Sequence, residues 1–143
     1  MARAKDLRLE RMGQVWLFSS CTKSELATIG RASEEVRVPA GTVLCEQGRP
    51  GSEFYLILDG EAAVRRNGHT VASLGPGGSF GELALLTSMP RNATVEATGD
   101  CLLLVLHQRD FNGLLDEVPG LAHRLLASLA TRLYEADTGS VSR

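Results

Sequence analysis

The sequence lacks the features that would place it in a membrane or outside the cell. No apolar run approaches the roughly 20 residues that span a bilayer, so no membrane segment is expected. The charged stretch Met1–Arg11 has no apolar core of the kind that a secretory signal needs. The three cysteines, Cys21, Cys45 and Cys101, are odd in number and far apart, which favours reduced thiols over a disulfide framework. Together these absences predict a cytoplasmic protein.

An excess of charge of one sign is also missing. Fifteen lysines and arginines stand against 17 aspartates and glutamates, for a formal net charge of −2. This balance gives no general electrostatic reason to bind nucleic acid or a membrane surface.

The motifs of several enzyme classes are absent or incomplete. There is no Walker-type phosphate loop, and the three histidines and three cysteines show no ligand pairing, so no metal is expected. Gly77–Gly81 matches the G-x-S-x-G elbow of serine hydrolases around Ser79, but that elbow needs a parallel α/β sheet and a longer chain. We therefore expect no catalytic activity and no cofactor.

What is present fits one domain of 143 residues, large enough to fold without disulfides or metal. Apolar residues at three- and four-residue steps predict helices within residues 6–32, with Thr22 or Ser24 as a cap. A second helical pattern covers residues 109–136, and the polar end from Asp137 onward is expected to fray.

Between these helices, residues 34–107 carry short apolar strands separated by glycine-rich turns. Asp59-Gly60 and Asn67-Gly68 are strong turn signals, and Asn67-Gly68 predicts a tight hairpin. Short strands at this spacing are typical of an antiparallel sandwich or roll. The predicted fold is mainly β with flanking α: an antiparallel β-roll, similar to a double-stranded jelly roll, between N- and C-terminal helices.

One segment, Gly75–Val95, does not follow the strand rhythm. Its glycines lead into Glu82–Leu86, which is long enough for little more than one helical turn, and Arg91 follows directly after Pro90. Unpaired amides at a helix start, close backbone approach at glycine and a nearby arginine together outline an anion site. The alternative interpretation is a glycine-rich connection with a structural ion pair between arginine and glutamate.

The run Phe80-Gly81-Glu82-Leu83-Ala84-Leu85-Leu86, followed by Pro90-Arg91-Asn92-Ala93-Thr94-Val95, resembles the phosphate-binding cassette of cyclic-nucleotide-binding domains. That family includes protein kinase A regulatory subunits, gated channels and catabolite activator proteins. The resemblance spans roughly Leu17 to Tyr134 and implies a regulatory module that binds a cyclic nucleotide, with the cassette at residues 80–95.

The resemblance also implies roles for individual residues. Arg91 would pair with the cyclic phosphate, and Glu82 would accept the ribose 2′-hydroxyl. Main-chain amides would complete the phosphate cradle, from Gly81, Leu83, Ala84, Asn92 and Ala93. Apolar side chains would line the sugar and base, namely Val64, Val71 and Leu83. The last helix would cover the base as a lid, through Arg132, Leu133 or Tyr134.

Asn92 departs from the family pattern, in which alanine, serine or threonine commonly follows the arginine. This leaves the base preference between cAMP and cGMP open, and cAMP is favoured only as the commoner ligand. A second hypothesis is an interaction domain of the same fold with a degenerate pocket. DNA-binding relatives add a helix-turn-helix after the lid helix, which is not expected here because the chain stops at Arg143. The terminal helices would instead contact a second copy or another protein.

Overall fold

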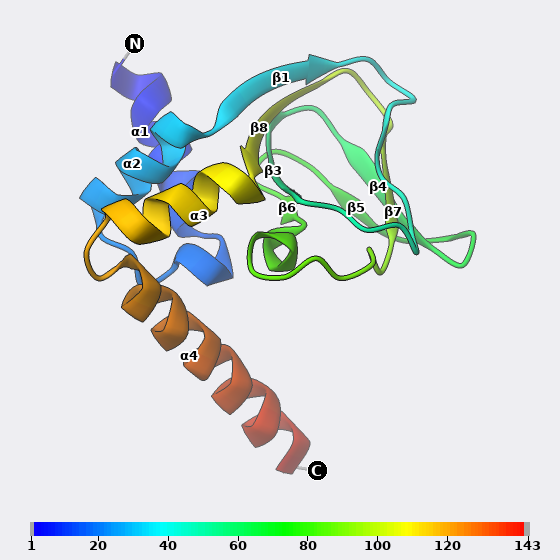
Figure 1. The fold of residues 1–143 in the computed structure, drawn as a ribbon. Coiled ribbons are helices and arrows are strands. Elements are labelled where there is room, and N and C mark those ends of the chain that lie inside the picture. Colours follow the sequence, from blue (N-terminus) through cyan, green and yellow to red (C-terminus); the bar gives the residue numbers. More distant parts are fainter. Residues whose placement is uncertain (1, 142–143) are drawn as a thin grey trace. The chain divides into compact units, whose positions relative to one another are not determined.

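The computed structural model describes the backbone of residues 2–141 and the side chains of residues 7–138. The described chain divides into two compact units (Figure 1). Residues 31–112 form a β-unit, while residues 1–30 and 113–143 form a helical unit. The prediction that all 143 residues act as one domain stays a prediction, and the units are described separately below.

The β-unit consists of two antiparallel four-stranded sheets, which confirms the predicted roll. One sheet has the order β1-β8-β3-β6 and the other the order β2-β7-β4-β5. The strands are β1 (Glu34–Val38), β2 (Val43–Cys45), β3 (Glu53–Asp59), β4 (Ala62–Arg66), β5 (His69–Leu74), β6 (Ser79–Phe80), β7 (Thr94–Ala97) and β8 (Cys101–His107). Because most neighbouring strands other than β4 and β5 are far apart in sequence, the roll brings the predicted cassette beside strands that precede it by about thirty residues.

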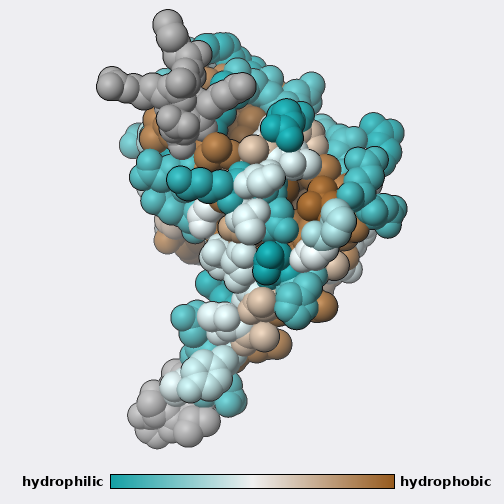
Figure 2. Space-filling view, turned by 90° about the vertical axis from the view of Figure 1, so that its left-hand side faces the viewer, coloured by the Kyte–Doolittle hydropathy of each residue, from teal (hydrophilic) through white to brown (hydrophobic). Residues whose placement is uncertain are grey.

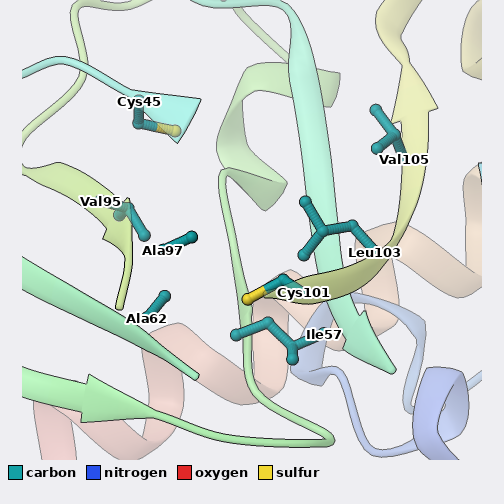
Figure 3. Close-up of a cluster of buried hydrophobic side chains, with 8 residues drawn as sticks. All are labelled: Cys45, Ile57, Ala62, Val95, Ala97, Cys101, Leu103 and Val105. Carbon is teal, nitrogen blue, oxygen red and sulfur yellow. The ribbon is translucent and has the colours of Figure 1, made fainter. Parts of the chain in front are cut away.

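Buried apolar side chains from both sheets meet between them (Figure 3). Each sheet contributes four members of this cluster, which are Ile57, Cys101, Leu103 and Val105 from the first and Cys45, Ala62, Val95 and Ala97 from the second. All eight are at most 6% exposed. Burial of each larger aliphatic side chain stabilises the fold by roughly 1.5–3 kcal/mol. Side chains point alternately inward and outward along the strands, so the inward ones pack between the two sheets and hold them face to face.

The predicted hairpin at Asn67-Gly68 is confirmed by the pairing of β4 with β5. Asn67 has φ 53° and Gly68 has φ 81°, so both residues at the tip adopt left-handed conformations. This is the geometry that matches the twist of adjoining strands, and asparagine and glycine are the residues that tolerate it best.

The helical unit contains α1 (Ala2–Gly13), the 3-10 turn η1 (Trp16–Phe18), α2 (Lys23–Ala32) and α4 (Leu121–Val141), and the chain passes between units within α3 (Gln108–Glu117). Thr22 caps α2 as one of the two predicted caps. Its hydroxyl accepts from the Glu25 amide at 3.1 Å, while the Thr22 amide donates to the Glu25 carboxylate at 2.8 Å. This reciprocal pair satisfies two amides at the helix start.

The last helix is longer than predicted. We expected it to end at residue 136, but α4 continues to Val141. We predicted an earlier end because the residues from Asp137 onward are polar. The hydrogen bonds of a helix are made by its backbone, however, so polar residues are tolerated on every exposed face.

Apolar side chains remain exposed along α4. Leu126, Leu133 and Tyr134 are 63%, 71% and 72% exposed. Figure 2, in which α4 lies at the bottom, shows hydrophobic side chains there among hydrophilic ones. In the part of the chain that the structure describes, no helix is both long and apolar enough to cross a bilayer.

Candidate functional site

The predicted cassette begins where β6 ends. Gly81 follows β6 with φ 82°, a left-handed conformation that turns the chain sharply into the 3-10 turn η2 (Glu82–Leu85). Ala84 and Leu85 are buried and fix this turn to the core, whereas Leu83 is 48% exposed. The sequence prediction of a single short helical turn before Arg91 is therefore confirmed.

Arg91 is the most constrained basic residue of this region. Its side chain is only 9% exposed, and its Nη2 donates to the Glu53 carbonyl oxygen at 2.9 Å and to the Glu53 carboxylate at 3.3 Å. The two residues are 38 positions apart in sequence and meet because β3 lies against the cassette. A charge-assisted pair of this kind holds a guanidinium in one orientation.

Two glycines make room for the Arg91 guanidinium. A Cβ on Gly51 would lie 2.1 Å from the Arg91 Nε, and a Cβ on Gly81 would lie 2.6 Å from its Nη1. Any other residue at either position would force the guanidinium to move. We expected the glycines of Gly75–Val95 to let the backbone approach a ligand, and in the structure one of them, Gly81, lets it approach the arginine.

The main chain of Arg91 is also held. Its amide donates to the Arg49 carbonyl oxygen at 2.8 Å, and its own carbonyl accepts from the Gly48 amide at 2.8 Å. The loop before β3 is thereby tied to the loop after η2. Arg91 is preorganised through both its backbone and its side chain, which is what a binding site for a charged group requires.

A cavity of about 260 Å³ lies beside Arg91. Seven residues of the predicted site line it, namely Val64, Phe80, Gly81, Glu82, Arg91, Asn92 and Ala93. Leu83 and Ala84 line an adjoining hollow of about 110 Å³ on the outer side of the turn. The structure therefore brings these nine predicted residues together at Arg91.

Val71 and Arg132 were also predicted, and neither is among the described residues that line these two hollows. Val71 is on β5, 52% exposed, and is not among the described residues that line the cavity. Arg132 belongs to the helical unit, where its guanidinium lies 5.0 Å from the centre of the Trp16 ring. The amide of Ala84, predicted to face a phosphate, already donates to the Gly81 carbonyl at 3.0 Å within the turn.

Sequence reasoning missed several residues of the site. Glu53 and Gly51 hold Arg91 in place, and neither lies near the cassette in sequence. Arg66 lines the cavity from β4 and donates through its Nε to the Asn92 carbonyl oxygen at 3.0 Å. No local sequence signal links Gly48, Gly51 or Glu53 to Arg91.

Two groups with raised pKa values lie at or next to the cavity, Cys45 in its lining and Tyr55 against Phe80. Burial raises the pKa of the Cys45 thiol to about 11, with the Arg91 charge acting in the opposite direction. Burial likewise raises the pKa of Tyr55 to about 12. Tyr55 stacks on Phe80 with ring centres 4.9 Å apart and supports the strand that leads into Gly81. Both groups stay neutral at ordinary pH, so they add no charge to the site.

The arrangement suits a ligand with one anionic end and one flat apolar end. The guanidinium of Arg91, the start of a helical turn and a carboxylate line one part of the cavity, and apolar side chains of β4, β5 and β7 line another together with Arg66. A cavity of this composition can bind and orient such a ligand.

The chain is similar to known proteins in both sequence and fold. The family model described as "Cyclic nucleotide-binding domain" matches residues 35–118. The cAMP-dependent protein kinase regulatory subunit of Hypocrea atroviridis is 40% identical over 111 residues, which is 78% of this chain and 24% of that protein.

Two solved structures are similar in fold. The N-terminal domain of a transcriptional regulator from Streptomyces coelicolor A3(2) has a TM-score of 0.83 at 28% identity, covering 90% of this chain and 95% of that one. The regulatory domain of Toxoplasma gondii protein kinase A, solved with cAMP, has a TM-score of 0.70 at 34% identity, covering 76% and 43%. The chain spans between about a quarter and a third of the length of the curated relatives it matches.

Proposed function

Because the chain belongs to the cyclic nucleotide-binding domain family, we propose that it is a non-catalytic regulatory module that binds a cyclic nucleotide, with cAMP favoured over cGMP. The observation that carries this proposal is the preorganised Arg91, held by Glu53 and two glycines at the edge of a cavity of about 260 Å³.

The two ends of the cavity bind different parts of the ligand. Arg91 binds the cyclic phosphate by charge-assisted hydrogen bonds, and main-chain amides at the start of η2 add donors. Glu82 accepts the ribose 2′-hydroxyl, which a 3′,5′-cyclic nucleotide leaves free. The apolar wall of Val64, Leu74 and Val95 receives the base.

The relatives support the preference for cAMP. The Hypocrea relative is named a cAMP-dependent kinase subunit, and the Toxoplasma domain was solved with cAMP. No turnover is expected from Ser79, because it lies on β6 in an antiparallel sheet rather than at an elbow between a parallel strand and a helix.

The output of binding is a change in the helices. Ligand phosphate stabilises one arrangement of the cassette, and the C-terminal helices shift in response, as a redistribution between existing conformations. The exposed Leu126, Leu133 and Tyr134 give α4 an apolar surface for a second copy or another protein. Analytical ultracentrifugation with and without cAMP measures whether that partner is a second copy.

The test is calorimetric titration of the protein and of Arg91→Ala with cAMP and cGMP. Loss of the charged partner of a buried phosphate should weaken binding by about 2–5 kcal/mol, or roughly thirtyfold to several thousandfold in Kd. Arg49→Ala is the matched control, because the Arg49 side chain is 76% exposed and pairs with Glu46. Equal affinity in Arg91→Ala and the unaltered protein would place the phosphate elsewhere.

Binding of neither nucleotide would favour the second hypothesis, an interaction domain with a degenerate pocket. A thermal-shift screen separates the two cases, because a saturating ligand raises stability by RT ln(1 + [L]/Kd). A screen in which no nucleotide moves the melting temperature would speak for the interaction domain.

A further inference from the structure

A second arginine, Arg66, lines the cavity. Arg66 is the last residue of β4, outside the cassette, and it lines the same cavity as Arg91. Its Nε donates to the Asn92 carbonyl oxygen at 3.0 Å, so the side chain lies against the residue that follows Arg91. That bond uses one of the five N–H donors of a guanidinium.

The hairpin that carries Arg66 is fixed by side-chain hydrogen bonds. The Gln47 amide group donates to the Asn67 side chain at 2.9 Å, and the Asn67 main-chain amide donates back to Gln47 at 2.8 Å. The Gln47 main-chain amide donates to the Thr94 hydroxyl at 3.0 Å. The tip of the hairpin is thus tied to the first residue of β7, and Arg66 starts from a fixed backbone.

The position of Arg66 differs from that of Arg91 in what surrounds it. Arg91 lies with Gly81 and Glu82 at the end assigned to phosphate and ribose, whereas the wall that carries Arg66 also presents Val64 from β4 and Val95 from β7. Apolar side chains beside a guanidinium form the kind of surface against which a nucleobase packs.

A guanidinium distinguishes between purines. Guanine presents two neighbouring acceptors, O6 and N7, and arginine donates to both at once. Adenine presents N7 beside an amino group that is itself a donor, so the second hydrogen bond is lost.

We propose that Arg66 is a specificity-determining residue that reads the acceptor edge of a 6-oxopurine base. This inference rests on the proposed function and deepens it. Arg66 strengthens the binding of a guanine nucleotide more than that of an adenine nucleotide. The ratio between the affinities of the cavity for cAMP and for cGMP is therefore smaller than it would be without Arg66. Without Arg66 the same cavity would discriminate more strongly in favour of cAMP.

The experiment measures Kd by calorimetry for cAMP, cGMP and cyclic inosine monophosphate, with the unaltered protein, Arg66→Ala, Arg66→Lys and Arg65→Ala. Cyclic inosine monophosphate retains O6 and N7 but lacks the guanine amino group. Arg65→Ala is the matched control, because it removes the same charge from the adjacent residue, which pairs with Glu96 and does not line the cavity. Thermal denaturation of each variant without ligand verifies that it is folded.

In Arg66→Ala, we expect Kd for cGMP and cyclic inosine monophosphate to rise about tenfold more than Kd for cAMP. Arg66→Lys should lose most of this difference, because lysine keeps the charge but not the planar pair of donors. Arg65→Ala should leave the ratios between the three ligands unchanged.

Three results would overturn the inference. An equal loss of affinity for all three ligands would mean that Arg66 acts through its charge or through Asn92. Unchanged Kd values would mean that Arg66 takes no part in binding. In either case the proposed function stands. If the unaltered protein binds none of the three ligands, the proposed function fails and the inference fails with it.

Discussion

Two arginines show how differently the β-unit and the helical unit are built. Arg91 is 9% exposed, hydrogen-bonded to Glu53 and enclosed by Gly51 and Gly81, so its position is determined from several sides. Arg132 lies over the Trp16 ring at 5.0 Å on an exposed helix. A contact of the second kind contributes about 0.5–1 kcal/mol and is easily exchanged for another.

Two side-chain contacts of the helical unit are also longer than the hydrogen bond of Arg91 to the Glu53 carbonyl. In the helical unit, Arg124 and Glu25 are 3.5 Å apart, and the hydroxyls of Ser19 and Ser128 are 3.4 Å apart. These distances are at the long end for hydrogen bonds. Arg91 is thus held by a shorter contact than these two pairs of the helical unit.

The sharpest test of rigidity in the β-unit is Gly51→Ala. The new Cβ would displace the Arg91 guanidinium, so Kd for cAMP should rise roughly thirtyfold, the lower end of the effect expected for Arg91→Ala. The free energy of unfolding should fall by about 1–3 kcal/mol, because the displaced guanidinium loses its hydrogen bonds to Glu53. Gly99→Ala, where a Cβ meets nothing within 4 Å, is the control for calorimetry and denaturation. Unchanged affinity in Gly51→Ala would show that the enclosure of Arg91 is not needed.

In the helical unit, the corresponding test is Glu25→Ala. This change removes the reciprocal cap with Thr22 and leaves the buried Nε of Arg124 without its carboxylate neighbour. We expect a loss of about 1–3 kcal/mol in the free energy of unfolding, measured with urea. Thr22→Ala, which removes only the cap, should cost less. If the two variants were equally destabilised, the pair with Arg124 would contribute nothing.

Glu82→Gln tests the ribose contact within the rigid site. Replacing a charged acceptor by a neutral one should raise Kd for cAMP about tenfold. The same variant should bind 2′-deoxy-cAMP nearly as well as the unaltered protein does, because that ligand lacks the hydroxyl. A loss of similar size for both ligands in calorimetry would remove the assigned role of Glu82.

Arg132→Ala should have the smallest effect. Loss of the contact with Trp16 should lower the free energy of unfolding by less than about 1 kcal/mol. If Arg132 also contacts the base as predicted, Kd for cAMP should rise a few-fold. Trp16 is the only tryptophan in the sequence, so its fluorescence reports directly on this region during a cAMP titration. A signal that cAMP leaves unchanged in the unaltered protein would argue against movement of the helical unit.

Much of the fold could be predicted because its signals are local. Asn67-Gly68 forms the expected hairpin, Thr22 forms the expected cap, and Gly81 leads into the expected short turn. Each of these features depends on residues within a few positions of one another. Their geometry follows from the backbone preferences of individual residues, which the local sequence indicates.

The surroundings of Arg91 could not be predicted in the same way. Glu53 is 38 residues away and reaches Arg91 only because the strands fold back. The sequence left open an ion pair between an arginine and a glutamate, and in the structure Arg91 pairs with Glu53. The role of Arg66 was missed because two adjacent arginines before a hairpin give the same pattern as a solvated strand end. Such contacts are set by strand register, which no short motif records.

The central claim is that Arg91 binds the phosphate of a cyclic nucleotide, and a crystal structure of the protein with cAMP tests it most directly. The account predicts phosphate oxygens about 3 Å from the Arg91 guanidinium, with the ribose beside Glu82. A cavity filled by the protein's own side chains, or a phosphate bound away from Arg91, would contradict it.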